Sequence, residues 1–155
     1  MLKKNGITLI IFLFSVLFLN GSFRVVPECK KQGIKGTVFL VKGNQMPSPD
    51  IPPPVPKPFK TTVYIYALTD ISQVVKQDES SFYTDIRTKL IKVVQSNSKG
   101  GFKVRLDPGQ YSVFTKKGEL FYANTFDQYN HIAPVTVEPG NFAEITIRVD
   151  DEAVY

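Results

Sequence analysis

The side chains best suited to binding or chemistry gather late in the chain, in a stretch that mixes aromatic rings with amides and acids. The stretch 118–132 contains Phe121, Tyr122, Phe126, Tyr129 and His131. Aromatic rings beside polar groups can form a platform for a sugar or for a partner protein. The opposing interpretation is that these rings close one end of a hydrophobic core. We call 118–132 the aromatic loop and treat the five residues as a candidate binding surface.

His131 is the one histidine of the chain, and it follows Asp127 and Asn130 in a polar segment. These groups could hold a cation or place a general base. Asp and Asn near turns usually bond the local backbone instead, so we expect a cluster that caps the loop. A catalytic zinc site takes about three protein ligands, and the sequence shows neither a second His nor a nucleophile elbow. We therefore expect no catalytic residue, cofactor or metal, and a protein that is not an enzyme.

Cys29 is the one cysteine of the chain. Bacterial lipidation uses a Cys directly after an apolar segment, but Val26, Pro27 and Glu28 stand where that signal requires Leu and small residues. A single Cys cannot form a disulfide within its own chain. Its thiol is therefore free, lipidated, or paired between chains in an oxidising compartment.

The first residues have the layout of a secretory signal. Lys3 and Lys4 precede the apolar run 7–19, and small or polar residues follow at 20–22. A membrane span needs roughly 20 apolar residues, so the run favours a cleaved signal over a permanent anchor, which stays the alternative. We expect removal of 1–21 and a periplasmic or extracellular mature protein.

Composition limits the class of protein. A chain of 155 residues suits one domain, and 43% hydrophobic with 21% charged residues is typical of a folded globular protein. After the expected signal 1–21, basic residues form no cluster beyond the pairs Lys30-Lys31 and Lys116-Lys117, so a nucleic-acid partner has little support. The expected partner is an envelope protein or a glycan that the sequence does not identify.

From Gly33 onward, short apolar runs and alternating patterns are separated by Gly, Pro, Asn and Asp, which predicts an all-β fold. We expect about seven strands, which include 37–41, 61–68, 89–95, 102–106, 111–114, 135–138 and 143–149. A Pro-rich loop, 46–60, separates the first two, because proline cannot donate to a β-ladder. For 70–87 we expect no more than one or two helical turns, capped by Asp70.

Two turns predict β-hairpins. Gly100-Gly101 lies between 89–95 and 102–106, and Pro139-Gly140-Asn141 lies between 135–138 and 143–149. The alternation assigns six side chains to the core: Phe102, Val104, Leu106, Tyr111, Ile145 and Ile147. Strands of this number and spacing pack most simply as a β-sandwich of two sheets.

The segment 96–113 resembles the carboxypeptidase regulatory-like domain, in which a polar turn with Gly is followed by Phe-x-Val-x-Leu and then by Pro-Gly-x-Tyr. Here these motifs begin at Phe102 and Pro108. The segments 33–38 and 62–65 are similar to the first two strands of that family, so the resemblance covers 33–149. It implies a seven-stranded transthyretin-like Greek-key β-sandwich. In the peptidases that carry this domain it follows a zinc catalytic domain and is itself non-catalytic.

The expected organisation is a signal peptide at 1–21, a flexible arm at 22–32, the sandwich at 33–149 and a C-terminal tail at 150–155. The expected function is a non-catalytic exported binding or structural module of the cell envelope. A carbohydrate-binding module that uses the aromatic loop is the first alternative, and an accessory subunit of an envelope enzyme is the second. Ligand and oligomeric state stay open at this point.

Overall fold

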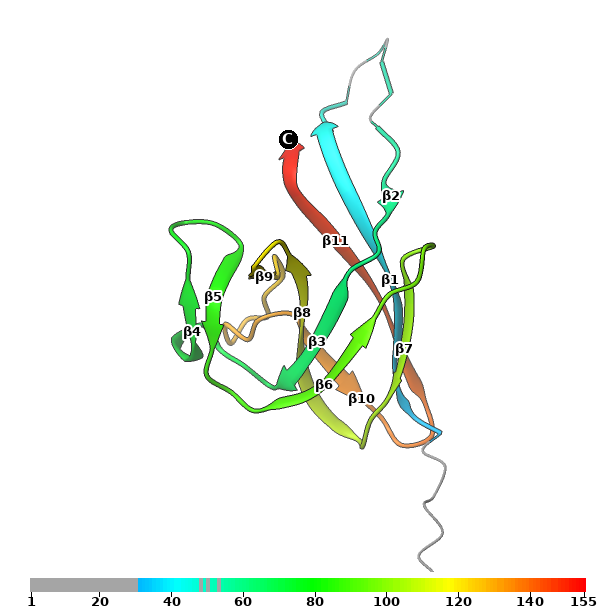
Figure 1. The fold of residues 1–155 in the computed structure, drawn as a ribbon, viewed down its shortest axis with the longest axis vertical. Helices are drawn as coiled ribbons and strands as arrows, with labels where there is room; N and C mark the ends of the chain where they lie inside the picture. The colour runs from blue at the N-terminus through cyan, green and yellow to red at the C-terminus, as the bar shows by residue number, and fades with distance from the viewer. Residues whose placement is uncertain (1–30, 48, 50, 53) are drawn as a thin grey trace, which may run out of the picture.

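The computed structural model describes residues 31–155 except 48, 50 and 53. The predicted signal peptide, Cys29 and most of the predicted arm therefore lie outside the described residues. The described chain is an all-β fold of two sheets (Figure 1). No helix in this part of the chain is long and apolar enough to cross a membrane. In chain order the strands are β1 (Gly33–Asn44), β2 (Lys57–Pro58), β3 (Thr62–Ala67), β4 (Val74–Lys76), β5 (Phe82–Ile86), β6 (Leu90–Gln95), β7 (Gly101–Arg105), β8 (Gly109–Lys117), β9 (Leu120–Tyr122), β10 (Pro134–Val137) and β11 (Phe142–Val154).

The four-stranded sheet is built around β1. One edge of β1 pairs in parallel with β11, starting at Gly33 opposite Phe142. The other edge pairs antiparallel with β7 and then with β2. Within the described part of the chain, β11 pairs with β1 alone, so its second edge is open.

The seven-stranded sheet has the order β4-β5-β9-β8-β3-β6. Strand β8 is long enough to pair with β10 along its first half and with β9 along its second half, on the same edge. Its other edge pairs with β3. The segment 150–154, expected as a tail, continues β11.

The main hydrophobic core lies between the two sheets. Its buried members include Ile34, Val38, Val63, Ile65, Phe102, Val104, Leu106, Tyr111, Val113, Tyr122, Val137 and Val149. Four of the six predicted core residues are in this set, whereas Ile145 and Ile147 are only partly buried and pack against it. These two isoleucines face a cleft, which is described below.

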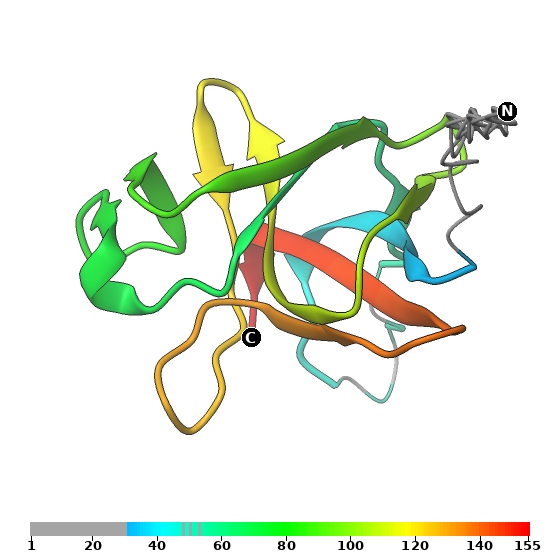
Figure 2. The ribbon, with the colours of Figure 1, turned by 90° about the horizontal axis from the view of Figure 1, so that it is seen from below.

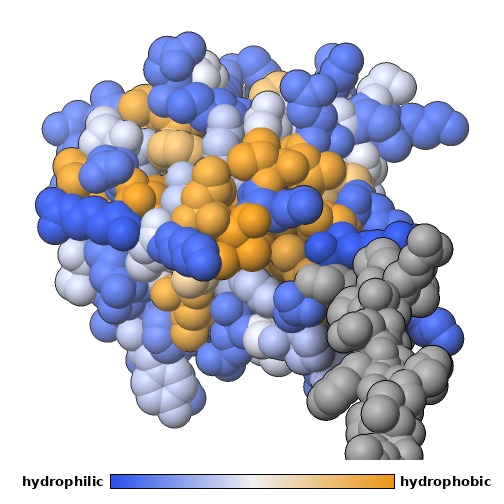
Figure 3. Space-filling model, turned by 60° about the horizontal axis from the view of Figure 1, so that its bottom comes forward, coloured by the Kyte–Doolittle hydropathy of each residue, from blue (hydrophilic) through white to orange (hydrophobic). Residues whose placement is uncertain are grey.

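A second cluster lies on the opposite face of the seven-stranded sheet, since successive side chains of a strand alternate between faces. It contains Tyr66, Val74, Tyr83, Ile86, Phe114, Ala123 and Ile132. Its members come from strands β3, β4, β5 and β8 and from the segment that follows β9. Other apolar side chains stay exposed, among them Leu90 and Val93 on β6. Figure 3 shows hydrophobic side chains gathered across the middle of the face that is seen when the molecule is tipped forward.

The expected number of about seven strands is too low, because four strands come from segments that we expected to be loop or helix. They are β2, β4, β5 and β9. In 70–87, Asp70 does cap a helical turn, but that turn is the single 3-10 turn Ile71–Gln73. Val74 and Val75 then pair with β5 instead of continuing a helix. Their β-branched side chains favour this extended conformation.

The two predicted hairpins are wrong, although both turns are present. Strand β6 pairs with β3 and β7 pairs with β1, so the turn at Gly100 crosses from one sheet to the other. Likewise β10 pairs with β8 while β11 pairs with β1. At Gly100 the backbone has φ of +76°, and an added Cβ would lie 2.3 Å from the Val38 carbonyl oxygen. The glycine therefore allows the close crossing between sheets.

Candidate functional site: the aromatic loop and the cleft beside β11

The structure separates the five predicted surface residues into two groups. Phe121 and Tyr122 lie on β9 and pack against other rings, whereas Phe126, Tyr129 and His131 lie in the loop that follows. The Phe121 ring meets Tyr64 edge-on with 5.1 Å between centroids. The Lys116 ammonium lies 4.6 Å from the Phe121 centroid, a cation–π contact. Phe121 is thus a packing residue of the sheet's outer face.

Tyr122 points the other way, into the core between the sheets, and only 1% of its surface is exposed. Its hydroxyl donates to Asp150 Oδ1 at 2.6 Å and accepts from the backbone N–H of Asp150 at 3.2 Å. Burial, with the nearby carboxylate, raises the pKa of the Tyr122 hydroxyl well above its ordinary value. This side chain connects the two sheets through a polar contact inside an apolar core.

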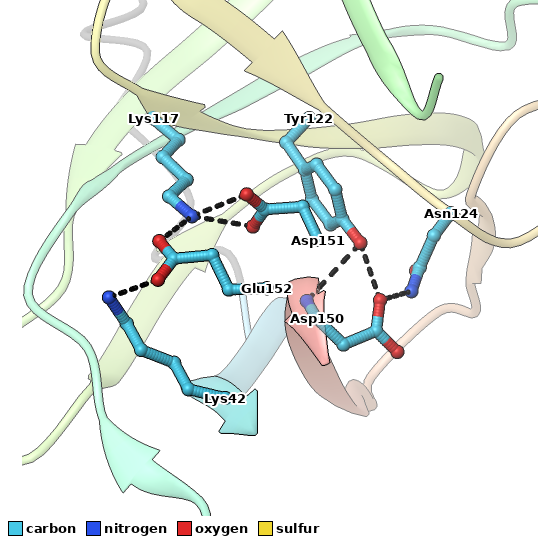
Figure 4. Close-up of polar contacts among 7 residues, drawn as sticks. All are labelled: Lys42, Lys117, Tyr122, Asn124, Asp150, Asp151 and Glu152. Atoms are coloured by element: carbon cyan, nitrogen blue, oxygen red, sulfur yellow. Dashed lines mark hydrogen bonds and ion pairs between the residues drawn. The ribbon is translucent and has the colours of Figure 1, made fainter. Parts of the chain in front are cut away.

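A β-bulge in β11 places Asp150, which binds Tyr122, and the two acidic residues that follow it. Leu40 pairs with Val149 and Lys42 pairs with Glu152, so two steps along β1 correspond to three along β11. A bulge redirects side chains that would otherwise alternate between faces. Asp150 and Asp151 both reach partners on the seven-stranded sheet (Figure 4).

Asp150 is held by three donors. Besides Tyr122, its oxygens accept from Asn124 Nδ2 at 2.7 Å and from the Tyr155 hydroxyl at 2.9 Å. Desolvation raises the pKa of Asp150, but these hydrogen bonds outweigh it and leave the pKa below its ordinary value. The carboxylate is therefore charged at neutral pH and its oxygens are engaged.

The neighbouring acids form an ion cluster with two lysines (Figure 4). Lys117 Nζ lies 2.6 Å from both oxygens of Asp151 and 2.7 Å from Glu152 Oε1, while Lys42 binds Glu152 Oε2 at 2.6 Å. Hydrogen bonds from Lys117 and Lys42 lower the pKa of Glu152 to about 2. Desolvation lowers the pKa of Lys117, but its bonds to the two acids outweigh that effect and raise it. The cluster fastens the end of β11 to β8 and β1.

The segment that follows β9 is held in a fixed shape by Asp127. Its Oδ1 accepts from the backbone N–H groups of Tyr129 and His131, both at 2.9 Å, and its Oδ2 lies 2.7 Å from His131 Nδ1. Desolvation raises the pKa of Asp127, but the hydrogen bonds from His131 and Tyr129 leave it lowered. Asn130 adopts φ of +64°, a left-handed conformation that Asn tolerates. This is the geometry of a loop-capping cluster.

The base of the segment is anchored to the rest of the fold. The backbone N–H of Ile132 donates to the Thr69 carbonyl at 2.8 Å, and that of Ile71 donates to the Asn130 carbonyl at 3.2 Å. At the tip, Phe126 is 46% exposed and Tyr129 is 69% exposed. Two of the five predicted residues therefore present exposed rings on a well-anchored loop.

A cleft of about 370 Å³ lies between β10 and β11, beside the base of the aromatic loop. Figure 2 shows the two strands leaving a common turn and separating. The apolar lining comprises Val113, Ala123, Ala133, Pro134, Val135, Ile145 and Ile147, and the polar lining comprises Asn124, Thr125, Thr146, Arg148 and Asp150. Ala133 has φ of +41°, which is unusual for a residue with a Cβ. Sequence reasoning missed this cleft because it placed the two strands side by side in one hairpin.

Among the described residues, no group of three or more His, Cys, Asp or Glu side chains is arranged to hold a metal ion. Comparisons with models of protein families, with curated proteins and with solved structures return no match to the chain.

Proposed function

We propose that the protein is an exported, non-catalytic binding module of the cell envelope that contacts a partner protein through Tyr129 and Phe126. The observation that supports this proposal is the exposure of both rings on a loop whose backbone Asp127 fixes. Aromatic side chains provide large contact areas for few rotatable bonds. A fixed loop also loses less conformational entropy when a partner binds.

The fold part of the proposal is a stand-alone carboxypeptidase regulatory-like domain with a transthyretin-like arrangement. Seven strands (β1, β3, β6, β7, β8, β10 and β11) form its two layers, and the other four strands are additions. The Pro-Gly-x-Tyr motif supports this assignment, because it lies at the crossing from β7 to β8. There the Tyr111 hydroxyl donates to the Asp107 carbonyl at 2.8 Å and closes the turn.

The experiment compares envelope proteins cross-linked to the wild-type protein with those cross-linked to Tyr129→Ser and Phe126→Ser. We expect a partner that wild type captures and that at least one of these variants loses, with no change in melting temperature. Gln128→Ser, at an exposed position of the same tip, is the matched control and should retain the partner. Equal capture by all variants would place the binding surface elsewhere, with the Pro-rich loop 46–60 next to be tested.

Replacing Phe121 or Tyr122 by Ser should act differently, because these rings are packed. We expect each of these variants to lose stability whether or not it binds. A folded, non-binding Phe121→Ser protein would show that the ring contacts the partner directly and that our division of the five residues is mistaken.

One observation favours the carbohydrate alternative. The exposed Tyr129 is flanked in sequence by two amide residues, Gln128 and Asn130, and its ring lies 6.1 Å from the His131 ring at a tilt of 52°. A ring beside amides suits stacking and hydrogen bonding to a sugar. Affinity electrophoresis through gels that contain envelope polysaccharide would test this: retardation of wild type, lost in Tyr129→Ser, would replace the protein partner by a glycan.

A further inference from the structure

The open edge of β11 is long and lacks most of the usual protection. From Phe142 to Val149 this strand contains no Pro, Gly or Lys, and its bulge begins only beyond this stretch. Natural edge strands are commonly protected by short length, bulges, Pro or charged side chains, above all Lys. The charged side chains of this stretch are Glu144 and Arg148, which have opposite signs, so a second strand with complementary charges can still be accepted.

The inward side of the same stretch is apolar. Ile145 and Ile147 point toward the cleft and are only partly buried, although both pack against the main core. A strand added to this edge would shield them from water. The hydrophobic effect therefore favours a partner with apolar side chains at the facing positions.

The outward side carries opposite charges in a symmetrical pattern. Glu144 and Arg148 stand two positions to either side of Thr146. Glu144 binds Lys35 at 2.9 Å, yet its side chain is 75% exposed. Arg148 is exposed and makes no ion pair within the described chain, although its charge lowers the pKa of Asp150, after the hydrogen bonds that Asp150 accepts.

We propose that two copies of this chain pair antiparallel through β11, around a two-fold axis at Thr146. This register places Glu144 of each copy opposite Arg148 of the other on the outer face. It also places Ile145 opposite Ile147 on the inner face. Directly opposed side chains have their Cβ atoms about 4.5–5.5 Å apart, close enough for both kinds of pair. The interface is isologous, as in most homodimers.

The charges also disfavour the neighbouring registers. Moving the axis to Ile147 sets Glu144 opposite Asp150, so that like charges meet twice. Moving it to Ile145 sets Glu144 opposite Thr146 and forms no ion pair. If the pairing register of the two β11 strands is shifted by one residue, side chains on one face of the sheet come opposite side chains on the other face. The pairing centred on Thr146 is thus the register that the sequence of β11 favours.

The test is the oligomeric state of the mature protein, measured by sedimentation equilibrium over a range of concentrations. We expect wild type to dimerise and Arg148→Glu to raise the dissociation constant at least about tenfold, because two attractive pairs become repulsive. The double variant Glu144→Arg with Arg148→Glu restores opposite charges and should recover the wild-type constant within a few-fold. Arg105→Glu makes the same change of charge on β7, away from the open edge of β11, and should leave the dissociation constant unchanged.

Circular dichroism of each variant verifies that the fold is intact. A wild-type protein that stays monomeric at every concentration overturns the proposal. So does a dimer that Arg148→Glu leaves intact, or one that the charge-swapped double variant fails to restore. A dimer lost instead in Val93→Lys would assign self-association to the exposed edge strand β6 and would equally overturn it. None of these outcomes depends on the proposed role of the aromatic loop.

Discussion

Replacing Tyr122 by Phe tests whether the polar contact between the sheets stabilises the fold. The substitution removes one hydroxyl and leaves the ring, whose edge-on contact with Phe82 at 5.1 Å is kept. It deletes the bond that the hydroxyl donates to the charged Asp150 and the weaker bond that it accepts from the backbone. No cavity larger than one oxygen atom is created.

The expected loss of unfolding free energy is about 1.5–3 kcal/mol at pH 7, the usual range for a hydrogen bond to a charged group. The value belongs toward the middle of that range, because Asn124 and Tyr155 continue to hold the carboxylate. Urea unfolding followed by circular dichroism measures it, with an expected slope of about 1–3 kcal/mol per molar urea in both proteins.

The loss should also depend on pH. The pKa of folded Asp150 lies below its ordinary value, so its contribution to stability is fully present above the unfolded pKa, near 4, and is lost as pH falls through the folded pKa. The stability difference between wild type and Tyr122→Phe should therefore be constant from pH 5 to 8 and should shrink below about pH 4.

Tyr83→Phe is the matched control. Tyr83 is also fully buried, but its hydroxyl donates to the neutral Ala123 carbonyl at a long 3.4 Å. We expect a loss of no more than about 0.5–1.5 kcal/mol that does not vary below pH 8. Equal losses in the two variants, or a loss in Tyr122→Phe that stays the same at every acidic pH at which both proteins remain folded, would refute the assignment of the Tyr122 contribution to Asp150.

Three further predictions concern other parts of the chain. Lys117→Met should raise the pKa of Glu152 from about 2 toward its ordinary value of 4.5, and carbon NMR of the Glu152 carboxyl group measures this pKa. The stability that the charged Glu152 contributes should then be lost at a higher pH when the protein is acidified. Phe102→Ala should cost about 3–5 kcal/mol in urea unfolding, and Ile145→Ala only about 1–2, because the cleft already exposes part of Ile145; equal costs would mean that the cleft is closed in solution. Mass spectrometry of the exported protein should show loss of 1–21, whereas an intact N-terminus on a membrane-bound product would favour the anchor.

The positions and facing of the strands could be predicted because alternation is a local property. Phe102, Val104 and Leu106 are buried as the pattern required, with exposed Lys103 and Arg105 between them. The partners of the strands could not be predicted in this way. A turn with Gly or Pro-Gly serves a hairpin and a crossing between sheets equally well, and the choice depends on which strands the rest of the chain supplies.

The candidate site was only partly predictable for a similar reason. Phe121 and Tyr122 are adjacent and equally aromatic, and only their places on β9 send one to each face of the sheet. The bulge at Asp150 has no sequence signal, so the residues that follow it read as a polar tail. The Asp127 cap was predictable, since Asp commonly accepts from N–H groups two residues further on.

The parallel pairing of the first long strand with the last has a consequence for the order of events in folding. Gly33 contacts Phe142 and every later pair up to Val154 is equally remote in sequence, so the strand at the centre of the smaller sheet waits for the end of the chain. Pairings of such long range carry a large loop-closure entropy and are formed slowly. A nascent chain that lacks 142–155 has β1 without its neighbour on one side and cannot complete the layer. The four-stranded sheet can therefore form only after the segment 142–155 has been synthesised, long after its central strand β1.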